Sequence, residues 1–133
     1  MQRPGEQSNI SLTRFESMLK TNDVYFFDSE EFEDIIHHYL EIGKIALAKK
    51  ATKLGLEQHP SSSNLRLFQV EMFIFEDKLE QAESLLEELR LLEQSNEEIY
   101  IQKANICSRR DNHKEAISFL EQALSLTDDQ ADV

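Results

Sequence analysis

Three stretches of this sequence, each at the same distance from the last, decide its fold: IHHYLEIGKIALA (36–48), VEMFIFEDKLEQA (70–82) and ANICSRRDNHKEA (104–116). The offset is 34 residues both times, since 82 − 48 = 34 and 116 − 82 = 34. Each stretch ends on a small residue, namely Ala48, Ala82 or Ala116. Three more columns agree at this offset: Ile36, Val70 and Ala104; Tyr39, Phe73 and Cys107; Gly43, Asp77 and Asp111. A fixed period of this length is the signature of a repeat protein.

Each repeat predicts two helices joined by a short turn. In the first, Asp28 or Ser29 can cap a helix whose apolar residues recur at helical spacing, and Asp28 with Glu31 has the spacing of a capping box. Gly43 breaks this helix, and a second one follows until Pro60 ends it.

The second and third repeats follow the same plan. The serines at 61–63 offer N-caps to the second repeat, which turns at residues 76–78. The third begins near Ser95 and Asn96 and turns at residues 110–112. The chain holds only 3 glycines and 2 prolines, which disfavours β-sandwiches and barrels and favours long helices with short connections.

The net charge of the chain limits which classes of partner it can bind. A formal net charge of −12 makes nucleic acid and anionic membranes unfavourable partners, whereas basic peptides or proteins would be steered toward the chain. The alternative, that the charge only keeps the protein soluble, stays open. No apolar run approaches the length of a membrane span, and residues 1–9 lack a signal core, so the sequence predicts a cytoplasmic protein.

These repeats resemble the tetratricopeptide repeat family. The motif of that family has large, aromatic, turn, small and closing positions. In the first repeat these are Phe32 (large), Tyr39 (aromatic), Gly43 (turn), Ala48 and Gly55 (small) and Pro60 (closing). The third supplies Tyr100, Ala104, Asp111, Ala116 and Ala123, and the second is the most divergent, with Arg66 and Leu89 at two of these positions. The resemblance implies an all-α, right-handed superhelical stack of three helix-turn-helix repeats whose first helices line a concave groove.

The resemblance sets the expected domain boundaries. Three repeats at 29–62, 63–96 and 97–130 would form a single domain. Residues 1–28 would add a polar tail, a short amphipathic helix after Ser11 and an apolar lid at Val24–Phe27 over the first repeat. The alternative for Val24–Phe27 is a docking or dimerising patch.

The resemblance also implies a partner site on the first helix of each repeat. The positions that contact ligands in this family fall here on Glu30, Glu33, His37, Leu40, Glu41, Asn64, Leu67, Glu71, Ile74, Phe75, Glu98, Ile101, Asn105, Ser108 and Arg109. This set mixes carboxylates with an apolar centre, so the expected partner is a protein or peptide with basic and apolar residues. Some members of the apolar centre, Ile74 above all, can instead pack between helices.

One subset of the family clamps a C-terminal carboxylate with lysine, arginine and asparagine. The matching positions here hold Glu33, His37, Phe68, Glu98 and Gln102, which lack that chemistry. The sequence also contains no phosphate loop, nucleophile elbow or cysteine pair, and Cys107 lies in a core column. We therefore expect no enzyme and no cofactor. His37 with Glu33 and Glu41 is a weak candidate for a metal site. The alternative is that these three side chains form a solvated polar face.

The functional prediction is a protein-interaction scaffold that holds a partner segment in the groove. The second hypothesis is a structural assembly protein that forms homo-oligomers through the ends of its stack. The apolar side chains on both sides of the last predicted helix, Ile117 with Leu120 and Phe119 with Ala123 among them, support it. A regulatory domain of a larger enzyme is the third.

Overall fold

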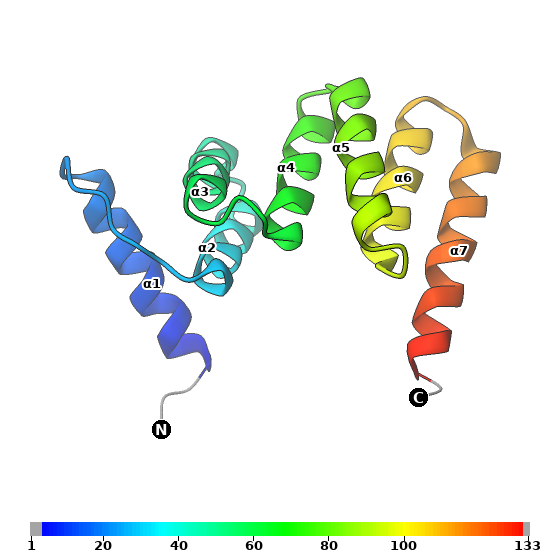
Figure 1. Ribbon diagram of the computed structural model, residues 1–133. Coiled ribbons are helices and arrows are strands. Elements are labelled where there is room, and N and C mark those ends of the chain that lie inside the picture. The colour runs from blue at the N-terminus through cyan, green and yellow to red at the C-terminus, as the bar shows by residue number, and fades with distance from the viewer. Residues whose placement is uncertain (1–3, 132–133) are drawn as a thin grey trace. The chain divides into compact units, whose positions relative to one another are not determined.

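A computed structural model describes the backbone of residues 4–131 and the side chains of residues 10–128. The described backbone is all-helical (Figure 1). Its helices are α1 (Pro4–Leu19), α2 (Ser29–Glu41), α3 (Ile45–Gln58), α4 (Ser63–Phe75), α5 (Leu79–Leu92), α6 (Glu97–Arg109) and α7 (His113–Ala131). None of these described helices has the length and apolarity that crossing a membrane requires.

The helix boundaries follow the sequence period. The first helices of the three pairs begin at Ser29, Ser63 and Glu97, and the second helices begin at Ile45, Leu79 and His113, each 34 residues apart. Side chains cap the starts of α4 and α6, as predicted. The Leu65 N–H donates to Ser62 Oγ at 3.3 Å, and the Glu98 N–H donates to Asn96 Oδ1 at 3.1 Å.

The same turn closes the first helix of every pair. Gly43, Asp77 and Asp111 have φ values of 75°, 60° and 60°, the left-handed region that ends helices. In each turn the next residue's N–H reaches back five residues, as Lys44 does to the Tyr39 carbonyl at 2.8 Å. The equivalent bonds are Lys78 to Phe73 at 2.7 Å and Asn112 to Cys107 at 2.8 Å. The predicted turn columns are therefore confirmed at the level of single hydrogen bonds.

Two of these turns hold a residue that the left-handed region disfavours. We expect Asp77→Gly to raise the free energy of unfolding by about 0.5 kcal/mol, and Gly43→Ala to lower it by about 1 kcal/mol. A Cβ on Gly43 would meet no atom within 4 Å, so the second effect isolates backbone strain from steric clash. Urea unfolding of both variants measures the two changes, and a neutral Gly43→Ala would contradict the argument.

Small residues stand where the second helices are buried. Ala48 and Ala82 are 0% exposed and Ala116 is 7% exposed, so this column is confirmed as equivalent and buried. Gly55 shows why size matters here. A Cβ on Gly55 would lie 3.1 Å from Cγ of Phe32 and 3.3 Å from Cδ1 of Leu65, closer than ordinary side-chain contact.

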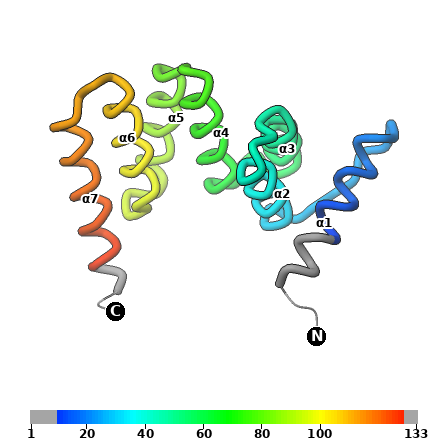
Figure 2. Tube along the Cα trace, turned by 180° about the vertical axis from the view of Figure 1, so that it is seen from behind, coloured from blue at the N-terminus to red at the C-terminus, as the bar shows by residue number. Residues whose placement is uncertain are grey.

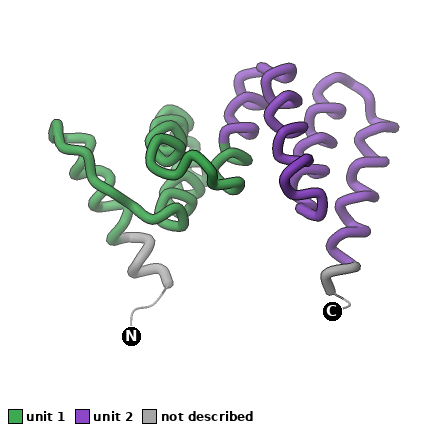
Figure 3. Tube along the Cα trace, viewed as in Figure 1, with its two compact units in different colours: residues 1–68 green, residues 69–133 purple. Residues whose placement is uncertain are grey.

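The chain forms two compact units, residues 1–68 and 69–133, so the division falls within α4 (Figure 3). The first unit contains α1, α2, α3 and the start of α4. The second contains the end of α4 with α5, α6 and α7, and its helices α6 and α7 lie side by side in both views (Figures 1 and 2). The uniform period of the sequence gives no sign of this division.

The N-terminal helix begins earlier than the sequence predicted. The expected polar tail over residues 1–10 is helical from Pro4, and its first three residues lie outside the described part of the chain. Proline suits the first position of a helix because its ring fixes φ and its missing N–H would have no helical partner there. The segment after Pro4 has no apolar periodicity, which is the signal that the prediction needed.

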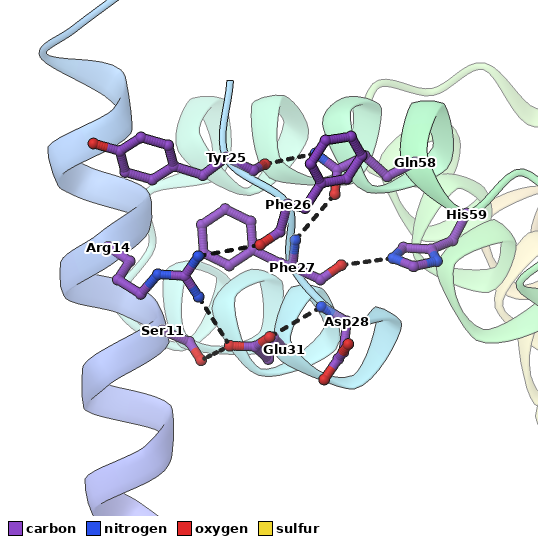
Figure 4. A network of polar contacts seen from close by, with 9 residues as sticks. All are labelled: Ser11, Arg14, Tyr25, Phe26, Phe27, Asp28, Glu31, Gln58 and His59. Carbon is purple, nitrogen blue, oxygen red and sulfur yellow. Dashed lines mark hydrogen bonds and ion pairs between the residues drawn. The ribbon is translucent and has the colours of Figure 1, made fainter. Parts of the chain in front are cut away.

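The lid segment (Val24–Phe27) runs in extended form from α1 to α2, and the end of α3 holds its backbone (Figure 4). Gln58 bonds it twice: the Phe27 N–H donates to Oε1 at 3.1 Å, and Nε2 donates to the Tyr25 carbonyl at 2.8 Å. Nε2 of His59 lies 2.7 Å from the Phe27 carbonyl, which can only accept, so the imidazole donates.

Only one aromatic side chain of the lid segment enters the core. Phe27 is 3% exposed, with ring centroids 6.1 Å from Phe15 and 5.3 Å from Phe32, whereas Phe26 is 78% exposed. The guanidinium of Arg14 lies 4.7 Å from the Phe27 ring centroid and donates to the Phe26 carbonyl at 3.2 Å. The expectation that this segment covers the first pair is confirmed through Phe27.

Glu31 ties α1 to the start of α2 (Figure 4). Its carboxylate accepts from the Ser11 hydroxyl at 2.6 Å and from the Asp28 N–H at 3.0 Å, which is half of the predicted capping box, and it lies 3.7 Å from Arg14 Nη1. Burial alone would raise the pKa of Glu31, but these three partners outweigh it and lower that pKa. The junction therefore keeps its charge until the pH falls below the usual glutamate range.

Tyr39 makes a second link to α1. Its side chain is fully buried, and its hydroxyl donates to Glu16 Oε1 at 3.1 Å. Burial, with the nearby Glu16 carboxylate, raises the pKa of Tyr39 to about 12, so the phenol stays a donor across the physiological range.

Candidate functional site

The predicted partner positions fall on two faces, one in each compact unit. The unit 1 face is defined by Glu30, Glu33, His37, Leu40, Glu41, Asn64 and Leu67. The unit 2 face is defined by Glu71, Ile74, Phe75, Glu98, Ile101, Asn105, Ser108 and Arg109.

The unit 1 face centres on Glu33. Its Oε1 accepts from Nδ2 of Asn64 at 3.0 Å, which joins α2 to the first turn of α4. Burial raises the pKa of Glu33; the Asn64 bond opposes this rise, while the charges of Glu30 and Asp34 add to it. A cation placed beside Glu33 would relieve both the burial and the repulsion.

The rest of the unit 1 face is more ordinary. Nε2 of His37 lies 3.0 Å from Oε1 of Glu41, one helical turn on, and both side chains are exposed. Leu40 is half-buried, and Leu67 is buried. Leu67 therefore belongs to the core, which removes it from the expected apolar centre. Among the described residues, no three histidine, cysteine or acidic side chains gather as metal ligands would.

Gln102 organises the unit 2 face. Its Nε2 donates to Oε1 of Glu71 on α4 at 3.3 Å and to Oε1 of Glu98 on α6 at 3.0 Å. Its own Oε1 accepts from Nδ2 of Asn105 at 3.2 Å. Because both carboxylates bond the same nitrogen, their accepting oxygens lie no more than about 6 Å apart. One neutral amide thus holds two negative charges close together.

Apolar surface adjoins these carboxylates. Phe75 lies one helical turn beyond Glu71 and is 58% exposed, and Ile101 is half-buried on the same face of α6 as Glu98. Ile74 is buried, so it packs inside the fold, which is the alternative that the sequence left open. The remaining members, Asn105, Ser108 and Arg109, are exposed.

The unit 2 face has a definite recognition chemistry. Two carboxylates held at this spacing repel each other. Nε2 of Gln102 lies between them, so a single ammonium or guanidinium bound beside the pair would be attracted to both. Phe75 and Ile101 offer apolar contact beside that position. The face suits a segment that carries a Lys or Arg next to an apolar side chain.

A cavity of about 300 Å³ lies elsewhere in unit 2, between α5, α6 and α7. Leu86, Ile106 and Phe119 contribute apolar walls, and the rim holds the ion pair of Arg110 with Glu83. Cys107 lines this cavity and is half-buried, so it is more accessible than its core column predicted. Burial, with the charges of nearby carboxylates, raises the pKa of its thiol, which therefore stays protonated near neutral pH.

Sequence reasoning had assigned Gln102 no positive role, because it entered only as a position where the carboxylate clamp is missing. Its spacing carried a usable signal. Glu98, Gln102 and Asn105 stand at i, i+4 and i+7, so they share one helical face. The bond to Glu71 joins two helices and could not be found from spacing within one helix.

Comparisons with models of protein families, with curated proteins and with solved structures found no match.

Proposed function

We propose that this chain is a tetratricopeptide-type repeat protein that binds a basic segment of another protein on the first helices of its repeats and catalyses no reaction. The observation that carries the proposal is the pair of carboxylates, Glu71 and Glu98, held by Gln102 beside the exposed ring of Phe75. The 34-residue spacing of helix starts and the shared turn support the repeat assignment.

The charged and the apolar side chains of the unit 2 face would contribute differently to binding. The carboxylates would speed the approach of a cationic segment and fix its position, because Coulomb attraction acts over several ångströms. Phe75 and Ile101 would supply most of the affinity through burial of an apolar side chain. The unit 1 face repeats this chemistry in weaker form, with Glu33 in place of the carboxylate pair.

Selection of peptides against the full chain, followed by binding kinetics, tests this proposal. We expect enriched peptides to place Lys or Arg beside an apolar residue. The double variant Glu71→Gln/Glu98→Gln should weaken them about tenfold, mainly through slower association and a flatter dependence on salt. Glutamine keeps an oxygen that Gln102 can bond, so the fold is left intact. Phe75→Ala should speed dissociation about five- to thirtyfold.

The matched control is Glu80→Gln/Glu88→Gln, which removes two exposed charges from α5. It changes the net charge by the same amount, from −12 to −10, and should leave binding within about twofold. Enrichment of acidic peptides, or equal losses in the two double variants, would place the site elsewhere.

A further inference from the structure

The last helix, α7 (His113–Ala131), has two apolar sides, and α6 covers only one of them. Ala116 and Ala123 are buried, and Phe119 beside them lies under Nζ of Lys103 from α6, 5.5 Å from its ring centroid. This side packs on α6. The other side is uncovered: Ile117, Leu120 and Leu124 are 56%, 48% and 61% exposed.

The uncovered side has the spacing of a helix–helix seam. Ile117, Leu120 and Leu124 follow one another by three and four residues, as do the apolar positions of a coiled coil. One flank of this seam is the row Ala116 and Ala123, which α6 already covers. The other flank is an exposed charged row at seven-residue intervals, Lys114, Glu121 and Asp128.

We infer that α7 binds α7 of a second copy of this chain, antiparallel, through this seam. The midpoint of Ile117 and Leu124 falls beside Leu120. A two-fold axis there sets each Ile117 against the partner's Leu124 and the two Leu120 side chains together. Like ends cannot meet in this arrangement, because the two helices run in opposite directions.

The charged row selects the second copy and its direction. Antiparallel helices bring their two charged rows together, so Lys114 of each chain meets Asp128 of the other, giving two attractive pairs and one repulsive Glu121 pair at the axis. A parallel two-fold pair would instead set each charged row beside the alanine row of the partner, so these attractive charge pairs would not form. The helix dipole adds to this preference, since a cation in the first turn and an anion near the end are unfavourable within α7 itself.

The interface is small, so the association is weak. The apolar seam covers only about two helical turns, roughly 10 Å of helix. We expect a monomer–dimer equilibrium in the micromolar range for the full chain. This association is independent of binding on the unit 1 and unit 2 faces.

Sedimentation velocity of the full chain between about 5 and 500 µM tests the inference. We expect Leu120→Ser to weaken the dimer at least about tenfold. The matched control Leu91→Ser changes a leucine on α5 that is 65% exposed, and it should leave the dimer unchanged. Circular dichroism confirms that each variant stays helical. A parent chain that is monomeric throughout, or an unchanged Leu120→Ser, would overturn the inference.

Charge exchange tests the direction of pairing. Lys114→Glu should weaken the dimer about tenfold at low salt, because two attractive pairs become repulsive. Adding Asp128→Lys should restore it, and Glu121→Gln should tighten it about twofold. If the double exchange fails to restore association, antiparallel pairing of α7 is ruled out.

Discussion

Replacing Phe27 with alanine is expected to lower the free energy of unfolding by about 3–5 kcal/mol. The ring is 3% exposed and packs edge-on against Phe15 and Phe32 beneath the Arg14 guanidinium, so its loss opens a cavity where α1 meets α2. Urea unfolding followed by circular dichroism measures the change.

The adjacent residue supplies the control. Phe26 belongs to the same segment but is 78% exposed, so Phe26→Ala should change stability by less than about 0.5 kcal/mol. Equal effects of the two substitutions would mean that the lid segment packs in another register.

Ala82→Leu is expected to destabilise the second unit by about 1–3 kcal/mol, because the position is 0% exposed and has no space for three more carbon atoms. The control Gln81→Leu introduces a leucine at the adjacent, exposed position of α5. That control should stay within about 0.5 kcal/mol of the parent. Thermal or urea unfolding compares the pair, and an Ala82→Leu protein as stable as the parent would refute the helix register.

Where structure is local, the sequence predicted it well. Gly43, Asp77 and Asp111 each close a helix through hydrogen bonds that span six residues or fewer, so a period read along the chain locates all three turns. The caps at Ser62 and Asn96 are equally local.

The candidate site was harder to predict, because adjacent helix positions differ sharply in burial. Ile74 is 6% exposed and Phe75 is 58% exposed, although both stand at positions that contact ligands in the resembled family. Counting positions along a helix predicts which side chains share a face with an uncertainty of one residue. Neighbouring side chains on a helix point in directions about 100° apart, so an error of one residue can exchange a buried position for an exposed one. The same limit hid the burial of Leu67.

The lid segment shows a different limit. Its apolar run predicted that an aromatic residue would cover the first pair, and Phe27 does so. Extended backbone points successive side chains to opposite sides, so one of Phe26 and Phe27 had to face outward. Which one does so depends on the bonds from Gln58 and His59, more than 30 residues further along the chain.

Those bonds from Gln58 also bear on the order in which the contacts of the first unit form during folding. They join residues 31 and 33 positions apart, whereas each turn between paired helices closes within six. Closing a longer loop costs more chain entropy, so α2 and α3 pair before the lid segment settles. On the ribosome α1 emerges first, yet its docking surface is complete only after Gln58 has been added. The lid segment is therefore made before α2 and α3, yet its backbone bonds to Gln58 form only after those two helices have paired.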